Sequence, residues 1–163
     1  MASFSIKQDY KSNDKYNTSY EMWEAIKQYI PKNKVLWEAF LLNNSTTKSL
    51  ENLRDLGFDV LGDTTIDFFD SDMGDVIVSN PPYSLKVKIF KRLALLDKPF
   101  ILILPIATIT KQFTKVLERR QIQLIVPTKR LHFIDGEDTT KRNWFDTCYF
   151  CYKIGLEYDI TFI

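Results

Sequence analysis

The chain has 163 residues, is 45% apolar and 26% charged, and carries a formal net charge of +1. This composition is that of an ordinary globular protein of one domain, or two at most. It excludes a general electrostatic attraction to nucleic acid, so any basic surface has to be local. Two cysteines and one histidine give neither a disulfide framework nor a zinc site, so we expect no metal and a reducing, intracellular compartment.

No apolar run approaches the roughly 20 residues that a membrane span needs. Residues 1–7 also lack the apolar core of a signal peptide. The sequence therefore gives no reason to expect a membrane among the partners of this protein.

The first half of the chain begins with a polar stretch, residues 1–17, which we expect to form an N-terminal arm before a single domain over 18–163. Apolar residues at helical spacing then predict a helix over 19–30, which Thr18 or Ser19 can cap. The next expected elements are a strand over 35–40, a helix over 46–56 that ends at Gly57, and a short strand over 59–62.

The second half continues the alternation of apolar strands and helices. The expected elements are strands over 75–79, 100–104 and 121–126, helices over 84–96 and 108–120, a late strand pair over 131–134 and 148–154, and a terminal strand over 158–163. Cys148 and Cys151 stand three residues apart on one of these strands, so their thiols should point to opposite faces of the sheet.

Strands that are apolar throughout and alternate with helices predict an α/β fold, with a mostly parallel central sheet and helices on both faces. In such sheets the ligand binds at the carboxyl ends of the strands. Four features fall at or just after such ends: Glu38, Asp63, Asp67 and the turn over 80–83.

The most informative of these features is the turn, Asn80-Pro81-Pro82-Tyr83, which follows the apolar strand over 75–79. Two prolines fix the backbone and remove two N–H donors, so the carbonyl groups can accept hydrogen bonds from another molecule. The tyrosine ring adds a flat apolar face beside them. This combination predicts a pocket for a planar group that carries an NH2, such as a nucleic-acid base.

In this alternating architecture the turn resembles that of the class I S-adenosylmethionine-dependent amino-methyltransferases, and among them the adenine-N6 DNA methyltransferases, including short viral members. The resemblance covers about residues 16–153. It implies a Rossmann-like class I methyltransferase fold with an antiparallel C-terminal strand, S-adenosylmethionine as cofactor and DNA as substrate. For a viral protein it implies the cytoplasm or nucleus of the host cell.

The chemistry of that family gives each residue of the turn a role. The lone pair of an exocyclic amine is delocalised into the adenine ring, so the amine is a poor nucleophile. The side-chain oxygen of Asn80 and the carbonyl of Pro81 can each accept one of its N–H groups, Pro82 keeps the turn rigid, and Tyr83 can stack on the extruded base. Catalysis would rest on positioning and electrostatics rather than on a strong base.

The resemblance also implies a set of cofactor-binding positions. Glu38 and Phe40 match the acid and the aromatic residue after the first strand, but Leu42 and Asn44 stand where the family has glycines. We therefore expect either another path for this loop or a weaker cofactor site. Further cofactor contacts are expected from these residues: Tyr16, Thr18, Asp63, Asp67, Phe68 and Asn80. A helix cap explains Thr18 about equally well.

Charge is uneven along the chain, because residues 111–142 contain eight basic and four acidic side chains. A rim that binds nucleic-acid phosphates would account for this, and so would an ordinary solvated surface. The segment over 129–133 resembles a family segment near the flipped base, although core packing explains Phe133 as well. The expected nucleic-acid contacts are Lys86, Lys88, Lys129, Arg130, Phe133, Lys141 and Arg142.

We expect no separate target-recognition domain in this chain. Either specificity is low, or a second copy or a recognition subunit supplies it, or the substrate is not duplex DNA. The leading hypothesis is methylation of adenine N6 in DNA. One alternative is an inactive homologue that acts as a nucleic-acid-binding or partner subunit, and another is an enzyme that methylates RNA adenine or a protein glutamine.

Overall fold

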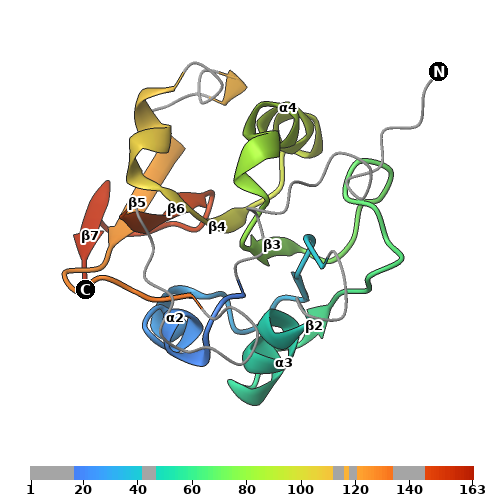
Figure 1. The fold of residues 1–163 in the computed structure, drawn as a ribbon, viewed down its shortest axis with the longest axis horizontal. Coiled ribbons are helices and arrows are strands. Elements are labelled where there is room, and N and C mark those ends of the chain that lie inside the picture. Colours follow the sequence, from blue (N-terminus) through green and yellow to red (C-terminus); the bar gives the residue numbers. More distant parts are fainter. Residues whose placement is uncertain (1–16, 42–46, 112–115, 118–120, 134–145) are drawn as a thin grey trace.

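The protein is described here from a computed structural model, over residues 17–41, 47–111, 116–117, 121–133 and 146–163. Within these residues one seven-stranded sheet crosses the molecule in the order β2-β1-β3-β4-β6-β5-β7 (Figure 1). The strands are β1 (Leu36–Trp37), β2 (Val60–Leu61), β3 (Val76–Ser79), β4 (Phe100–Pro105), β5 (Ile122–Val126), β6 (Thr147–Tyr152) and β7 (Ile160–Phe162).

Helices lie on both sides of this sheet, with α2 and α3 on one side and α4 on the other (Figure 1). The α-helices are α2 (Tyr20–Glu24), α3 (Lys48–Asp55) and α4 (Lys86–Leu96), and the 3-10 helices are η2 (Lys27–Tyr29), η4 (Tyr83–Leu85) and η5 (Ile106–Thr110). In the part of the chain that the structure describes, no helix has the length and apolar character of a membrane span.

The pairing of the strands confirms the predicted fold class. β1 pairs in parallel with β2 and β3, and β3 pairs in parallel with β4. β6 is antiparallel to both of its neighbours, β4 and β5, and β5 then pairs in parallel with β7. The result is a Rossmann-like, mostly parallel sheet with an antiparallel strand near the C-terminus.

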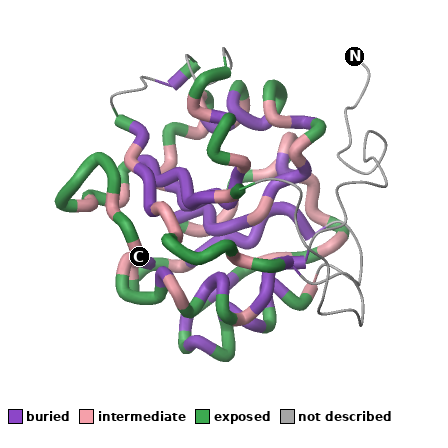
Figure 2. The backbone as a smooth tube through the Cα atoms, turned by 60° about the vertical axis from the view of Figure 1, so that its left-hand side comes forward, coloured by how far each residue is buried: buried purple, intermediate pink, exposed green. Residues whose placement is uncertain are grey.

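Two hydrophobic cores fill the space between the sheet and its helices. One joins α2 and α3 to the sheet around Trp23, Leu53 and Val78, and the other packs α4 around Phe90 and Phe100. Figure 2 shows buried segments of the chain, in purple, running through the middle of the molecule. In the central strands, such as β3, β4 and β6, alternate apolar residues serve the two cores, and Cys148 and Cys151 accordingly lie in different cores, as predicted.

Local sequence signals account for the ends of the first helices. The Oγ atom of Ser19 accepts a hydrogen bond from the backbone of Met22 at 3.4 Å, so Ser19 caps α2. Gly57 follows α3 with a φ of 93°, a conformation that glycine adopts without strain. The helix predicted over 19–30 is shorter than expected, because α2 ends at Glu24 and η2 follows it.

Two predicted elements are wrong in the described residues. The helix predicted over 108–120 is replaced at its start by η5, after which Lys111 is extended, because the β-branched residues of that segment disfavour an α-helix. The strand predicted over 131–134 is absent from 131–133. β6 already has β4 and β5 as neighbours, so its edges are filled without that segment. Residues 112–115, 118–120 and 134 lie outside the described part.

Candidate active site

The carboxyl ends of the parallel strands meet at one edge of the sheet, and the predicted site residues follow them. Glu38 comes directly after β1, Asp63 lies two residues after β2, and Asn80 comes directly after β3. β5 runs in the same direction as β4, so the segment that follows Val126 reaches the same edge. This edge is where ligands bind in doubly wound sheets.

The turn after β3 leaves the sheet as a rigid corner. Pro81 and Pro82 are buried, while Asn80 and Tyr83 are half-buried. Pro82 is extended, with φ −64° and ψ 118°, and its carbonyl accepts a hydrogen bond from the backbone of Leu85 at 3.1 Å. The prolines therefore hold the backbone straight until η4 begins, and they keep Asn80 at the end of the strand.

The side chains of the turn contact each other. The Tyr83 hydroxyl donates a hydrogen bond to Oδ1 of Asn80 at 3.0 Å. This bond fixes both the direction of the amide oxygen and the position of the phenol ring. The Nζ atom of Lys86, one helical turn further on, lies 6.0 Å from the centre of the Tyr83 ring and places a positive charge beside it.

Glu38 is buried behind this turn and connects it to the helices. One carboxylate oxygen accepts a hydrogen bond from the hydroxyl of Ser79, the residue before Asn80. The other accepts one from the hydroxyl of Ser49 on α3 at 2.5 Å. Ser49 in turn accepts a hydrogen bond from Nε1 of Trp23 on α2 at 3.0 Å, so the carboxylate connects two strand ends with two helices.

The surroundings of Glu38 raise its pKa to about 7. Burial has the largest effect, because it disfavours the charged carboxylate. The hydrogen bonds from Ser49 and Ser79 and one from the backbone of Phe40 act in the opposite direction, since they stabilise the charge.

Thr18 lies at the start of α2 and has a hydroxyl group for which the described residues provide no hydrogen-bond partner. The residue is 1% exposed, and its carbonyl oxygen accepts a hydrogen bond from Nδ2 of Asn52 on α3 at 3.0 Å. A buried hydroxyl without a partner costs free energy, so Thr18 keeps unused hydrogen-bonding capacity at the start of α2. Ser19 makes the cap, which removes that explanation for Thr18. Tyr16 lies outside the described residues.

The segment after β2 contains two carboxylates that organise tight turns. Oδ1 of Asp63 accepts hydrogen bonds from the backbone and the hydroxyl of Thr65, both at 2.6 Å. Oδ1 of Asp67 accepts one from the backbone of Phe69 at 2.9 Å. Both carboxylates stand near the carboxyl edge of the sheet, where the resemblance places contacts to the cofactor.

The aromatic residues predicted at the cofactor site lie in the core. Phe68 is fully buried and its ring centre is 4.7 Å from that of Phe40 and 5.6 Å from that of Trp37. Phe40 is also buried. Phe69 is half-buried and meets Phe68 edge to face, so it is the more accessible of the neighbouring pair.

The predicted basic rim is spread along the same edge. Lys88 and Lys129 are exposed, and Lys86 is half-buried next to the turn. Arg130 is exposed and forms a salt bridge of 2.8 Å with Asp146. Phe133 is buried in the core with α2, and Lys141 and Arg142 lie outside the described residues.

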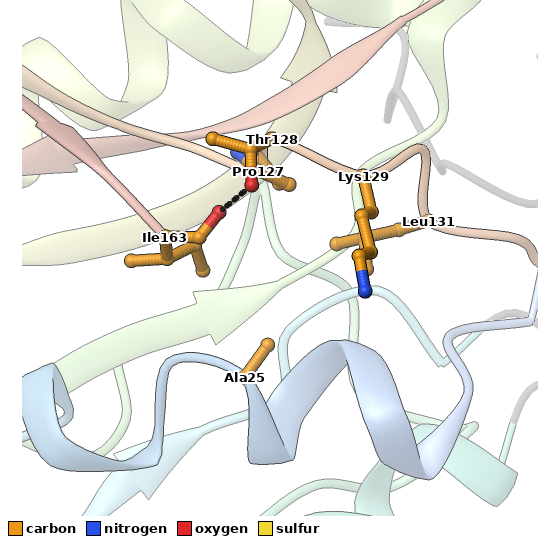
Figure 3. A pocket seen from close by; sticks show the side chains of 6 residues that line it. All are labelled: Ala25, Pro127, Thr128, Lys129, Leu131 and Ile163. Carbon is orange, nitrogen blue, oxygen red and sulfur yellow. Dashed lines mark hydrogen bonds between the residues drawn. The ribbon is translucent and has the colours of Figure 1, made fainter.

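Two adjacent hollows follow β5. One, of about 370 Å³, is lined by Ala25, Pro127, Thr128, Lys129, Leu131 and Ile163 (Figure 3). The hydroxyl of Thr128 donates a hydrogen bond to the carbonyl of Ile163 at 2.7 Å and closes one side. The other hollow, of about 330 Å³, reaches Ile106 after β4 and the Arg130–Asp146 pair, so it opens on the same edge of the sheet as Asn80.

Sequence reasoning placed the turn and Glu38 at this edge of the sheet but missed the residues that join them. Ser79, Ser49 and Trp23 are ordinary strand and helix residues in the sequence, and Ser79 lies 41 residues from the carboxylate that it contacts. The available signal was a serine at the inner end of an otherwise apolar strand, where a buried hydroxyl requires a partner. In the described part of the chain no cluster of metal-ligating side chains occurs.

No protein-family model and no curated protein matches this chain. The solved structures to which the chain is similar include two methyltransferases. The precorrin-6y C5,15-methyltransferase of Geobacter metallireducens GS-15 is 10% identical with a TM-score of 0.49, over 93% of this chain and 98% of that one. The ribosomal protein L11 methylase of Lactobacillus delbrueckii subsp. bulgaricus is 13% identical with a TM-score of 0.44, over 80% and 76%. Similarity at this level says nothing about the reaction of this chain.

Proposed function

We propose that this protein transfers a methyl group from S-adenosylmethionine to the N6 amine of adenine in DNA. The observation that carries the proposal is the Asn80-Pro81-Pro82-Tyr83 turn at the carboxyl end of β3, in which Tyr83 holds the amide oxygen of Asn80. The turn combines a fixed acceptor, a rigid backbone and an aromatic face at the edge where this fold binds ligands.

The turn is suited to an aromatic amine. An amide oxygen has two lone pairs, so Oδ1 of Asn80 can accept an N–H group of the base while it keeps the bond from Tyr83. The Pro81 carbonyl accepts the other N–H group, and the Tyr83 ring stacks on the extruded base. Two acceptors on one amine localise its lone pair and direct it away from the ring.

A second group of residues, at the start of α2 and after β2, would bind the cofactor. The Thr18 hydroxyl, which has no partner among the described residues, would bind the carboxylate of the cofactor. Asp63 and Asp67 would bind its ribose and adenine, while Phe40 and Phe68 support the site from the core. When bound, S-adenosylmethionine would supply a methyl group: its sulfur–methyl bond would break as the nitrogen–methyl bond forms, which leaves S-adenosylhomocysteine as a neutral thioether, and the methylated amine would lose one proton to water.

DNA would lie along the basic rim. Lys86 and Lys88 follow the turn directly, and Lys129 and Arg130 stand beside the hollows after β5, so phosphates could be bound on both sides of the extruded base. Lys141 and Arg142 stay sequence-based predictions of phosphate contacts, whereas Phe133 is buried in the core and the prediction that it contacts nucleic acid is wrong. A second copy of the chain or a recognition subunit would supply sequence specificity.

A second candidate function is nucleic-acid binding without catalysis. It is favoured by the absence of glycine at Leu42 and Asn44, since leucine does not readily adopt the left-handed backbone of a glycine-rich cofactor loop. A methyltransferase of RNA adenine or of a protein glutamine would use the same turn. Measuring transfer to DNA, RNA and a glutamine peptide separates these enzymes from the DNA enzyme.

Two measurements test the proposal. Titration calorimetry measures whether the purified chain binds S-adenosylhomocysteine, the form of the cofactor that remains after methyl transfer. Transfer of a tritiated methyl group is then measured to duplex DNA, single-stranded DNA, RNA and a glutamine peptide. We expect binding and transfer to DNA, and loss of transfer in Asn80→Ala but not in the exposed control Asn33→Ala. Nucleic-acid binding without cofactor binding would instead support the second candidate.

A further inference from the structure

The Glu38 carboxylate is placed between the turn and the helices rather than toward a ligand. Both of its oxygens accept hydrogen bonds from serine hydroxyls, one at the end of β3 and one on α3. The residue is 3% exposed, Ser79 is fully buried and Ser49 is 5% exposed. At this degree of burial the Glu38 carboxylate has almost no surface of its own for a ligand to contact, and both of its oxygens already bind buried serines.

The hydrogen bonds around Glu38 form a continuous chain from Trp23 through Ser49 and Glu38 to Ser79. Such a chain, closed from solvent in a packed interior, couples the positions of the elements that contribute to it. Its last member is bonded covalently to Asn80, the first residue of the turn.

We propose that Glu38 is a positioning residue: its hydrogen bonds hold the Asn80 turn in a fixed position relative to α2 and α3. The Ser79 branch holds the turn, and the Ser49 branch holds the start of α3. The inference rests on the proposed function, and it replaces a direct cofactor contact of the Glu38 carboxylate with an indirect role.

A carboxylate is well suited to this role because it offers two acceptor oxygens in one rigid plane. Glutamine has the same shape but only one acceptor oxygen, so Glu38→Gln can keep one serine bond in its native direction. The substitution Glu38→Gln should therefore lose the acceptor of one of the two serine bonds while the side chain still fills the same space, so we expect this variant to fold.

The two serines allow the branches to be separated. Ser79→Ala should lower kcat about tenfold or more while the dissociation constant of S-adenosylhomocysteine stays within about twofold, because a displaced acceptor affects the reacting geometry. Ser49→Ala should weaken S-adenosylhomocysteine binding roughly five- to tenfold and change kcat at saturation by less than about twofold.

A matched control exists at the opposite edge of the sheet. The Tyr152 hydroxyl donates a hydrogen bond to Asp97 at 2.8 Å, and Tyr152 pairs with Phe100 at the first residue of β4. Tyr152→Phe thus also removes a single side-chain hydrogen bond. We expect it to leave kcat and cofactor affinity unchanged.

A readout without cofactor or substrate keeps the inference separate from the proposed function. The side-chain amide of Asn80, labelled with nitrogen-15, should shift in Ser79→Ala and Glu38→Gln and stay in place in Tyr152→Phe. If the native chain transfers no methyl group but this signal moves, the proposed function fails and the positioning role stands. An Asn80 signal that is the same in Ser79→Ala as in the native chain would overturn the role, as would equal effects of both serine variants on kcat and affinity.

Discussion

Glu38 and Asp97 are carboxylates at opposite edges of the sheet, and each accepts hydrogen bonds from two side chains. Glu38 is buried and its partners are the neutral hydroxyls of Ser49 and Ser79. Asp97 is exposed, and it accepts bonds from Lys153 at 2.7 Å and Tyr152 at 2.8 Å.

The pKa values of the two acids move in opposite directions. The hydrogen bond from Lys153 has the largest effect on Asp97 and lowers its pKa, whereas burial raises that of Glu38 to about 7. Two hydrogen bonds from hydroxyls do not compensate for loss of water, because neither partner carries a charge. The comparison shows that the carboxyl edge keeps a costly buried acid, while the opposite edge has ordinary surface pairs.

The largest effect is expected on the rate of methyl transfer, when the Asn80 amide at the carboxyl edge of the sheet is removed. Asn80→Ala removes the acceptor at the end of β3, and we expect kcat for methyl transfer to fall on the order of 10²- to 10³-fold. S-adenosylhomocysteine binding, measured by calorimetry, should change little. A variant that keeps more than about a tenth of the native kcat would mean that the amide is not part of the reaction.

The second prediction compares the stabilising roles of the two acids. Glu38→Ala leaves the buried hydroxyls of Ser49 and Ser79 without their hydrogen-bond partner, and at pH 5 we expect a loss of about 4 kcal/mol in the free energy of unfolding. Asp97→Ala, an exposed control, should cost far less. Urea unfolding measures both, and equal losses would contradict the contrast between the two edges.

The third prediction is a dependence of stability on pH. Glu38 has a folded pKa above its ordinary value of 4.5, so the folded chain binds its proton more tightly than the unfolded chain. Its stabilising effect is complete below about pH 4.5 and is lost as the pH rises to about 7, a change on the order of 3 kcal/mol.

Urea unfolding at several pH values between 5 and 8 measures this loss as the difference between the native chain and Glu38→Gln. Asp97 has the opposite sign, because its lowered pKa makes its stabilisation disappear as the pH falls below its ordinary value of 3.8. A native curve parallel to that of Glu38→Gln between pH 5 and 8 would show that Glu38 does not titrate in that range.

The smallest effect is expected at the basic rim. Lys88→Ala and Lys129→Ala should each weaken DNA binding a few-fold, and the slope of log affinity against log salt should fall by about one for each lost phosphate contact. Lys32→Ala, which lies in the exposed turn before β1, is the matched control at the other edge. If all three variants changed DNA affinity and its salt dependence equally, Lys88 and Lys129 would not be specific phosphate contacts.

The strands of the sheet were predictable because their apolar runs are continuous. The stretches over 75–79 and 100–104 match β3 and β4 to within one residue at each end. Segments with mixed signals failed: the β-branched stretch after Pro105 forms η5, and the segment at 131–133 is not a strand. The periodicity of the sequence does not show that both edges of β6 are already paired, with β4 and β5, so it cannot exclude a further strand at 131–133.

The candidate site was predictable to the extent that one short motif defines it. The turn and Glu38 lie at the ends of recognisable strands, so topology alone brings them to one edge. The bonds of Ser79 and Ser49 to Glu38 could not be predicted, because they depend on side-chain directions at the ends of β1, β3 and α3. The buried hydroxyl of Thr18 likewise became informative only when Ser19 proved to be the cap.

The placement of Cys148 and Cys151 on the two faces of β6 has a practical consequence. Both thiols are buried, and burial raises the pKa of each, to about 12 for Cys148. A maleimide or a disulfide reagent reacts with the thiolate, so the folded chain should remain unlabelled until β6 separates from its neighbours. The protein thus carries an internal reporter of global unfolding, and a single cysteine placed on the surface would accept a fluorophore without removal of the native pair.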